Sequence, residues 1–347
     1  MTLKVFRHID IAPLVAHRPL ETKLGEALML LPQGDDLADR LAKAKQLGAR
    51  FAILGVPEDL GPKANMGRGG SQLGWQAFLS RFLNLQSHGS LAPQSILLLG
   101  ELELNDLQEQ GDALSNQRPE QLARLRDLVG EVDKRLRPVI KALADAGLIP
   151  IVIGGGHNNA YPILAGMHDA LGQPLAVLNV DPHADFRPPE GRHSGNGFRY
   201  AHDEGALAAY QVLAFNPLKN SASSQQALAE AGFGGVSYQQ LYVERSVTLG
   251  EALTRCSKQL LGGHPTGLEL DLDAISFLPA SAYTNAGMPL ADAEHLIFKG
   301  ARLLRPSYLH LCEGAPARHP AGSQHGMSDV GQATAALVTA FIQAMND

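Results

Sequence analysis

Six residues whose side chains can bind divalent metal ions occur in three short segments of the chain. They are His157 in GGGHNNA, Asp181, His183 and Asp185 in DPHAD, and Asp271 and Asp273 in DLD. Carboxylates and imidazoles without sulfur suit manganese best, with iron, cobalt and nickel as alternatives. Because neighbouring carboxylates raise one another's pKa, such a cluster needs positive charge. Two divalent cations would balance the four aspartates and would lower the pKa of a bound water, which is hydrolytic chemistry.

The spacing within two of these segments agrees with a shared centre. In an extended segment, residues two positions apart point to the same side. Asp181, His183 and Asp185 can therefore converge, and so can Asp271 and Asp273.

Each segment taken alone has a simpler explanation. An aspartate after a strand is more often a helix cap or a turn former, and a lone histidine is more often a loop or core residue than a ligand. Three such segments in one chain, each at the end of an apolar run, favour metal binding over these alternatives.

Short apolar runs are the elements that must position these residues. They cover residues 49–57, 95–101, 148–156, 174–181, 210–215, 267–273 and 307–314, with a weaker candidate at 234–240. Their apolar residues are continuous rather than alternating, as in parallel strands that are buried on both faces. Amphipathic helical stretches accompany them at 37–48, 122–147, 291–304 and 333–345. The alternation predicts an α/β fold with helices on both faces of the sheet.

The candidate ligands stand at the carboxyl ends of these predicted strands, where open α/β sheets bind their ligands. Glu313 stands in the same position after the run at 307–312. The polar segment 186–206 directly follows one of these strand ends, and we interpret it as a functional loop.

The size of the chain allows one large core. With 347 residues, 45% of them hydrophobic, we expect a single domain over residues 1–347. Residues 1–45 are less regular, and we expect an N-terminal extension that wraps the core or contacts a neighbouring subunit.

Charge and cysteine content exclude several classes of protein. The net charge of −6 argues against nucleic acid as a partner. The two cysteines lack Cys-x-x-Cys spacing, so neither a disulfide framework nor a thiolate metal site is expected. No stretch approaches the roughly 20 apolar residues that cross a membrane, and the N-terminus is not a convincing signal peptide. We therefore expect a cytoplasmic protein that acts on a small molecule.

The segments GGGHNNA, NVDPHADFR and LELDLDAIS resemble the metal-binding signatures of the arginase, agmatinase and formimidoylglutamase superfamily, the ureohydrolases. The resemblance extends from about residue 50 to the C-terminus and includes GVPEDLGPKANMGRGG at 55–70. It implies a three-layer α/β/α domain around a mostly parallel sheet of eight strands, two Mn²⁺ ions and assembly into a homo-oligomer.

The resemblance also implies roles for individual residues. One metal would take His157, Asp181, Asp185 and Asp271, and the other would take His183, Asp181, Asp271 and Asp273, with Asp181 and Asp271 as bridges. Asp185 would relay a proton to the leaving nitrogen of a guanidinium or amidine. Glu313 would pair with the cationic head of the substrate, unless it is a solvent-exposed turn residue.

The loop RHSGNGFR at 192–199 distinguishes members of the superfamily. Arginases carry Ser-Gly-Asn-x-His here, whereas this chain has Phe198 in place of the histidine and is more similar to the Ser-Gly-x-x-Phe of formimidoylglutamases. The third glycine of GGGH points the same way. This resemblance favours hydrolysis of N-formimidoyl-L-glutamate to L-glutamate and formamide, a step of histidine degradation.

Candidate substrate-binding residues follow from that loop. They are His193, Ser194, Asn196, Phe198 and Arg199, and Arg187, Arg192 and Arg318 are further candidates for binding the substrate carboxylates. His193 either replaces the missing histidine of arginases or is a loop residue, and we favour the second. The segment 274–290 departs from the superfamily's usual Asp-Pro and Pro-Gly turn.

Three alternatives stay open. The chain could be another ureohydrolase, of agmatinase, guanidinobutyrase or arginase type. It could be a metal-binding relative without activity, against which the complete set of six ligands argues. It could be an unrelated two-metal phosphatase, but no glycine-rich phosphate cradle accompanies the ligands.

Overall fold

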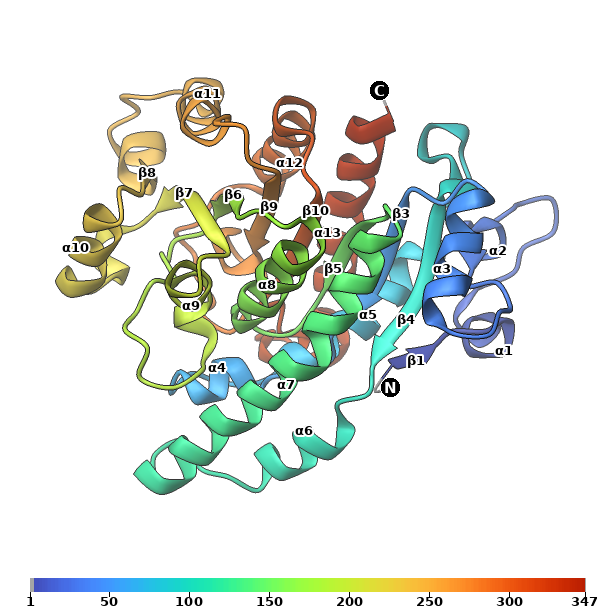
Figure 1. Cartoon of the computed structure of the whole chain (residues 1–347), viewed down its shortest axis with the longest axis horizontal. Coiled ribbons are helices and arrows are strands. Elements are labelled where there is room, and N and C mark those ends of the chain that lie inside the picture. The colour runs from blue at the N-terminus through green and yellow to red at the C-terminus, as the bar shows by residue number, and fades with distance from the viewer. Residues whose placement is uncertain (1–2, 347) are drawn as a thin grey trace.

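The predicted apolar runs form the strands of one sheet in the computed structural model, which describes residues 3–346 (Figure 1). The strands are β1 (Leu3–Val5), β2 (Met29–Leu30), β3 (Phe51–Gly55), β4 (Ile96–Leu102), β5 (Ile149–Ile153), β6 (Leu175–Val180), β7 (Leu207–Phe215), β8 (Gly234–Ser237), β9 (Thr266–Asp271) and β10 (Tyr308–Cys312). All eight expected strands are present. The weaker candidate at 234–240 corresponds to β8, which is the shortest of the eight strands. β8 ends at Ser237, and a helical turn begins at Gln239.

The sheet has ten strands, so the expected count of eight was too low. The two extra strands come from the N-terminal extension and are only two and three residues long, which is too short for a sequence pattern. Both pair with β4, β1 in the antiparallel and β2 in the parallel direction. The extension thus closes one edge of the sheet. The assignment of residues 1–347 to one domain stays a prediction.

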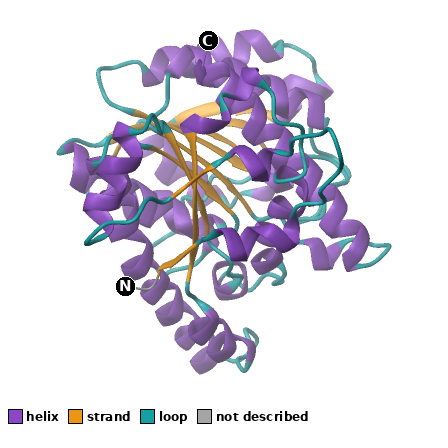
Figure 2. Ribbon diagram, turned by 90° about the vertical axis from the view of Figure 1, so that its right-hand side faces the viewer, coloured by secondary structure: helices purple, strands orange, loops and turns teal. Residues whose placement is uncertain are grey.

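Helices cover both faces of the sheet (Figure 2). They are α1 (His8–Ile11), α2 (Leu24–Ala27), α3 (Leu37–Gln46), α4 (Leu60–Ala64), α5 (Gly74–Phe82), α6 (Asn105–Asp112), α7 (Pro119–Asp145), α8 (Ala160–Leu171), α9 (Gly197–Asp203), α10 (Ala222–Glu230), α11 (Leu249–Leu260), α12 (Leu290–Leu304) and α13 (Ser323–Asn346). The three-layer α/β/α arrangement is as expected. The segment 186–206 is only partly a loop, because α9 lies within it.

The continuous apolar strands are explained by two separate hydrophobic cores. In β3, Phe51 and Ile53 face the core under α5, α11, α12 and α13, whereas Ala52 and Leu54 face the core under α3, α7 and α8. Successive side chains of a strand point to opposite faces, so burial on both faces requires apolar residues at every position.

The strand order places four carboxyl ends side by side. The sheet runs β1-β4-β3-β5-β10-β9-β6-β7-β8, and every pairing along it except that of β1 is parallel. The neighbours β5, β10, β9 and β6 lie at its centre and end at the same edge. Successive strands β5 and β6 are separated by two strands that come later in the chain.

Two further observations bear on the sequence-based expectations. Among the described residues, no helix combines the length and the apolar character that crossing a membrane requires. Cys256 and Cys312 are both buried and unbonded to each other.

Candidate metal centre and substrate cavity

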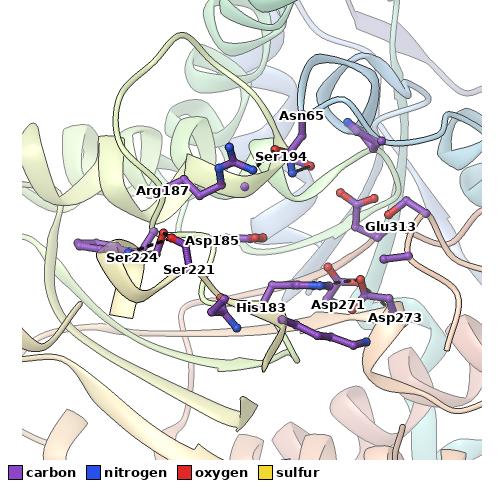
Figure 3. Close-up of a pocket in the computed structure, with 18 of the residues that line it drawn as sticks. Asn65, His183, Asp185, Arg187, Ser194, Ser221, Ser224, Asp271, Asp273 and Glu313 are labelled. Carbon is purple, nitrogen blue, oxygen red and sulfur yellow. Dashed lines mark hydrogen bonds and ion pairs between the residues drawn. The ribbon is translucent and has the colours of Figure 1, made fainter. Parts of the chain in front are cut away.

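A cavity of about 520 Å³ opens at the carboxyl ends of the central strands (Figure 3). Its base is lined by His183, Asp185, Asp271, Asp273 and Glu313, and its walls include Asn65, Arg187, Ser194, Lys219, Ser221, Ser224 and Ser281. The base therefore carries most of the predicted ligands. Two others, His157 and Asp181, lie directly beneath it and are fully buried.

His157 is positioned by the glycine-rich turn that follows β5. Gly155 has a φ of 71°, in the region that favours glycine, and a Cβ there would collide with the side chains of Glu58 and Asn159. The buried Glu58 carboxylate accepts hydrogen bonds from the Gly156 N–H at 2.7 Å and from Asn159 Nδ2 at 2.9 Å. This clamp fixes where the chain places His157, the first residue of a short 3₁₀ turn.

The two aspartate segments converge, but as turns rather than as the extended segments that we expected. β6 ends at Val180, and the His183 N–H donates to Asp181 Oδ1 at 2.6 Å. Asp185 has a φ of 46°, so the segment from 181 to 185 does not alternate like a strand. After β9, the Asp273 N–H likewise donates to Asp271 Oδ1 at 2.8 Å. Each first aspartate therefore organises the turn that carries the next ligand.

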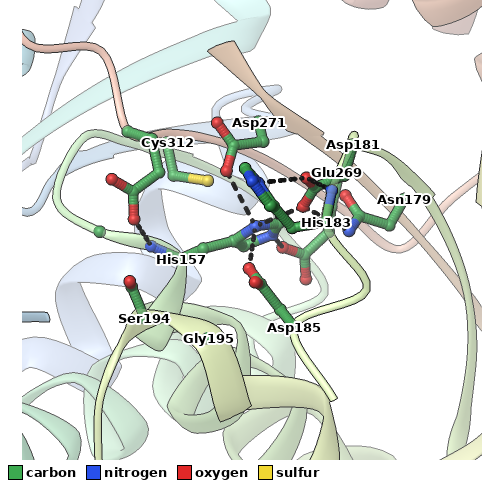
Figure 4. Close-up of polar contacts among 12 residues, drawn as sticks. His157, Asn179, Asp181, His183, Asp185, Ser194, Gly195, Glu269, Asp271 and Cys312 are labelled. Carbon is green, nitrogen blue, oxygen red and sulfur yellow. Dashed lines mark hydrogen bonds and ion pairs between the residues drawn. The ribbon is translucent and has the colours of Figure 1, made fainter. Parts of the chain in front are cut away.

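Two groups of ligand atoms result, and Figure 4 labels the residues of the first together with His183. In the first, His157 Nδ1 lies 3.0 Å from Asp181 Oδ2, 2.9 Å from Asp185 Oδ2 and 3.4 Å from Asp271 Oδ2. In the second, His183 Nδ1 lies 3.5 Å from Asp181 Oδ1 and 3.3 Å from Asp273 Oδ2. Asp181 belongs to both groups, whereas Asp271 belongs to the first only.

The chemistry of these groups fits a pair of cations. His157 Nδ1 and Asp273 Oδ1 are buried and make no hydrogen bond among the described residues. His157 Nδ1 faces the oxygens of Asp181 and Asp185, and the other oxygen of Asp273, Oδ2, lies 3.3 Å from His183 Nδ1. Buried polar atoms without partners are rare, and a metal ion would satisfy both. The six predicted ligands therefore stand where two divalent cations can be held, one by His157 with Asp181, Asp185 and Asp271.

The pKa shifts of Asp185 and His157 have the direction expected of a site that lacks positive charge. The pKa of Asp181 shifts the other way, because burial raises it but His157 and His183 lower it by more. Burial and the nearby charge of Asp181 raise the pKa of Asp185 to about 6. Burial lowers the pKa of His157, but Cys312 and the surrounding aspartates raise it by more, to well above its usual value. A proton on His157 thus takes the place that a cation would occupy, and metal binding would release it.

Glu313 is buried at the base of the cavity, so it is not a solvent-exposed turn residue. Its Oε1 accepts the His157 N–H at 2.7 Å, and its Oε2 has no hydrogen-bond partner among the described residues. Burial, together with the charges of Asp273 and Asp185, raises its pKa to about 8. One carboxylate oxygen is therefore available to a donor within the cavity.

A buried carboxylate that sequence reasoning missed lies behind His157. Glu269 accepts from Tyr308 Oη at 2.6 Å, and its Oε2 lies 2.7 Å from His310 Nδ1 and 3.0 Å from His157 Nε2. Burial raises the pKa of Glu269, but His310 and His157 lower it by more, to about 2. The sequence did contain a sign of this contact, namely a glutamate and a histidine inside otherwise apolar strands. A charged side chain that is buried in a strand requires a partner.

His310 and Cys312 also form a third group with His157, and all three are fully buried. Burial raises the pKa of the Cys312 thiol well above its usual value. Since the thiolate is the form that binds metals, this environment does not favour a sulfur ligand.

Among the five predicted substrate-binding residues, the structure brings only Ser194 to the cavity. Asn196 accepts a hydrogen bond from Arg192 at 2.8 Å, and Phe198 stacks on Tyr210 with a centroid distance of 4.3 Å. Arg199 is paired with Asp203 at 2.9 Å, one helical turn along α9. These contacts give the residues roles in the fold of the loop, and we withdraw them as direct contacts of substrate.

His193 is also a residue of the loop interior. Its ring is buried, and its Nδ1 accepts the Gly195 N–H at 3.1 Å while Nε2 lies 3.2 Å from Glu190. Burial and the charge of Arg187 lower its pKa to about 3, so the ring is neutral at ordinary pH. It does not line the cavity, which agrees with our preference for a loop residue over a proton shuttle.

The positive charges around the cavity differ in part from those expected. Arg192 is buried against Asp133 and does not reach the cavity. Arg187 lines the cavity wall, whereas Arg318 lines a second opening that shares Lys219 with the first. Lys219, which the sequence analysis did not select, has no ion pair among the described residues and stands at both openings.

Comparison with known proteins identifies the family. The model of the arginase family matches residues 49–345 of the chain. The chain belongs to the arginase family. Its N-terminal strands β1 and β2 lie outside the matched region, which agrees with the less regular composition of the first 45 residues.

The relatives of this arginase-family chain include formimidoylglutamases. That of Geobacillus kaustophilus is 28% identical over 316 residues, which is 88% of this chain and 85% of the relative. That of Geobacillus sp. strain WCH70 is 31% identical over 176 residues, 50% of this chain and 48% of the relative. The chain thus matches only about half the length of some curated relatives.

A solved structure confirms the fold at lower sequence similarity. Formiminoglutamase of Trypanosoma cruzi with Mn²⁺ has a TM-score of 0.68 and 20% sequence identity, and the match covers 93% of this chain and 99% of that one. At this identity the likeness concerns the fold, so the function of this chain has to be argued from its own residues.

Proposed function

We propose that this chain is a dinuclear manganese hydrolase that converts N-formimidoyl-L-glutamate and water to L-glutamate and formamide. The observation that carries the proposal is the pair of ligand groups around Asp181 at the base of a cavity whose wall carries positive side chains. The formimidoylglutamases among its relatives support the choice of substrate.

The candidate ligands would hold the metals at the base of the cavity. His157, Asp181, Asp185 and Asp271 would hold one Mn²⁺, and His183 and Asp273 would hold the second with Asp181 between them. When bound, the two ions would lower the pKa of a water molecule and stabilise negative charge on the attacked carbon's substituents. The remaining steps belong to side chains of the protein.

Glu313 and Asp185 supply those steps. The free Oε2 of Glu313 can accept a hydrogen bond from an N–H of the formimidoyl group, which would orient the planar amidine over the metals. The side chain of Asp185 lines the cavity beside its ligand position. It can transfer the proton released by water to the nitrogen that leaves with glutamate.

The cavity wall suits a substrate with two carboxylates. Arg187 Nη1 lies 3.3 Å from Asn65 Oδ1, which holds its guanidinium at the wall near Ser194. Lys219 also lines the cavity, together with Ser221 and Ser224 at the start of α10. A guanidinium and an ammonium in the lining of one cavity can pair with the α-carboxylate and the γ-carboxylate of the substrate.

The test is a panel of substrates with identification of the products. The metal-loaded protein is incubated with N-formimidoyl-L-glutamate, L-arginine, agmatine and 4-guanidinobutyrate, and formamide and urea are measured separately. We expect formamide and glutamate from the first compound and little urea from the others. Urea as the main product would replace the proposed substrate with a guanidino compound. No turnover of any compound would contradict an enzymatic role.

A further inference from the structure

We propose that Glu269 is a positioning residue that holds His157 in the tautomer whose Nδ1 can bind a metal ion. The inference rests on the metal centre of the proposed function, but not on the identity of the substrate. Glu269 itself does not line the cavity and cannot touch the substrate.

The two nitrogens of His157 face different environments. Nε2 lies 3.0 Å from Glu269 Oε2, whereas Nδ1 faces the oxygens of Asp181 and Asp185 at the metal site. A carboxylate can only accept a hydrogen bond. The hydrogen of a neutral imidazole therefore belongs on Nε2, which leaves the lone pair of Nδ1 directed at the position of the metal.

The sheet itself delivers Glu269 to this position. β9 and β10 pair in parallel with His310 opposite Glu269 and Cys312 opposite Asp271. Asp271 is thus two residues beyond Glu269 on the same strand. One strand supplies both a ligand of the metal and the partner of another ligand, so their separation is fixed by the backbone.

Two other donors hold the carboxylate in place. Tyr308 donates to Oε1 at 2.6 Å, and His310 Nδ1 lies 2.7 Å from Oε2. The ring of Tyr308 has room because residue 267 is glycine, where a Cβ would collide with that ring. Glu269, Tyr308 and His310 are all fully buried, so water does not compete for these hydrogen bonds.

The variant Glu269→Gln tests this inference, because a glutamine keeps the shape but presents a donor as well as an acceptor. His157 can then adopt the other tautomer, with its hydrogen on Nδ1. We expect Mn²⁺ to bind about 10- to 100-fold more weakly at the site of His157, as for losses of outer-shell partners of other metal ligands. The site of His183 should keep its affinity.

Equilibrium dialysis with Mn²⁺ gives the number and affinity of the ions, and electron paramagnetic resonance separates a coupled pair from a single ion. The wild type should show a coupled pair, and Glu269→Gln at limiting Mn²⁺ should show the signal of a single ion. Tyr308→Phe is the matched control, since it removes one hydrogen bond to Glu269 but leaves the contact with His157. It should retain the coupled pair.

Several results would overturn the inference. Two Mn²⁺ ions bound by Glu269→Gln with wild-type affinity would show that the tautomer does not depend on Glu269. An equal loss at both sites in a folded variant would also contradict it. If Glu269→Gln does not fold, Glu269→Asp takes its place, because the shorter side chain keeps the charge but moves it away from Nε2 of His157. Glu269→Asp must then bind Mn²⁺ more weakly at the site of His157 alone. Unchanged Mn²⁺ affinity in Glu269→Asp would overturn the inference.

The failures of the two proposals are distinguishable. A wild-type protein that binds two Mn²⁺ ions but does not hydrolyse N-formimidoyl-L-glutamate would contradict only the substrate. A wild-type protein that binds fewer than two ions would overturn both the metal centre and the role of Glu269.

Discussion

Lys219 is the residue on the cavity wall whose charge is least committed to the fold. Its ammonium has no ion pair within residues 3–346, whereas Arg187 also contacts Glu190 at 2.9 Å. A side chain that contacts substrate but not the fold should contribute to binding alone. This makes Lys219 the sharpest probe of the proposed carboxylate recognition.

Lys219→Ala should raise the KM for N-formimidoyl-L-glutamate by about 10-fold, equivalent to about 1.4 kcal/mol of binding free energy, and should leave kcat nearly unchanged. Steady-state kinetics on the Mn²⁺-loaded protein measures both constants. Lys141→Ala is the control, because Lys141 pairs with Asp145 on α7, away from the cavity. An unchanged KM in Lys219→Ala would remove Lys219 from the substrate site.

The sequence predicted the candidate ligands better than it predicted the residues around them. His157 and the aspartates are recognisable because ligand types and short spacings recur in one chain. Phe198 and Arg199 were selected by their position in a motif, but whether a side chain faces a cavity depends on the packing of α9 against its neighbours. Glu269 was missed because its partners His157 and Tyr308 are distant in the sequence.

Arg192 joins three elements behind the cavity wall. Its guanidinium contacts Asp133 of α7 at 2.7 Å and donates to the Asn158 carbonyl at 2.8 Å. It also packs against the rings of both Tyr161 and Tyr200, at 4.7 and 4.8 Å from their centroids. Arg192 thus connects the loop before α9 to α7 and to the turn that carries His157.

Arg192→Met should destabilise the protein by about 3–5 kcal/mol, because it leaves the buried Asp133 carboxylate without its partner. The free energy of unfolding from urea titration measures the loss. The double variant Asp133→Leu/Arg192→Met should recover much of it, since it removes the uncompensated charge. A loss below about 1 kcal/mol in the single variant would mean that the pair contributes no more than a surface ion pair.

At the scale of elements, strands were predictable and turns were not. Burial on both faces makes most residues of β3, β5, β6, β9 and β10 apolar at successive positions. The turn from 181 to 185 depends instead on a side chain that accepts a backbone hydrogen bond. A spacing of two residues is compatible with both a strand and this turn, so the sequence could not separate them.

At the scale of the whole molecule, folding buries acidic side chains, among them Glu313 and Asp185, without enough positive side chains beside them to keep them ionised. In the metal-free protein, burial raises the pKa of Glu313 from 4.5 to about 8 and that of Asp185 from 3.8 to about 6. A group whose pKa is raised by folding stabilises the fold below its unfolded pKa, and this contribution is lost as the pH rises through the folded value. The raised pKa of His157 acts in the same direction.

The metal-free protein should therefore lose several kcal/mol of unfolding free energy between about pH 4.5 and pH 8, at about 1.4 kcal/mol for each unit of pKa shift. Thermal unfolding with a chelator present, at pH 5.5 and pH 8.5, measures the loss. In the presence of saturating Mn²⁺, the unfolding free energy should depend much less on pH. Glu313→Gln should reduce the dependence in the metal-free protein, and an identical profile in that variant would assign the effect to other groups.

The fold class at the scale of the whole chain followed from the alternation of strands and helices. The order of the strands did not, because local patterns do not reveal which strands are neighbours. The edge strands β1 and β2 escaped prediction for a different reason, since they are too short to show a pattern. Assembly into a homo-oligomer remains a prediction from the resemblance to the family.

The position of β9 and β10 between β5 and β6 has a consequence for biosynthesis. A nascent chain that has emerged only to residue 265 contains both outer strands but neither of the two that join them. The apolar edges of β5 and β6 would then be unpaired and open to association with other chains. The ribosome must release β10 before the centre of the sheet can close, so the metal centre can form only after residues through Cys312 have emerged.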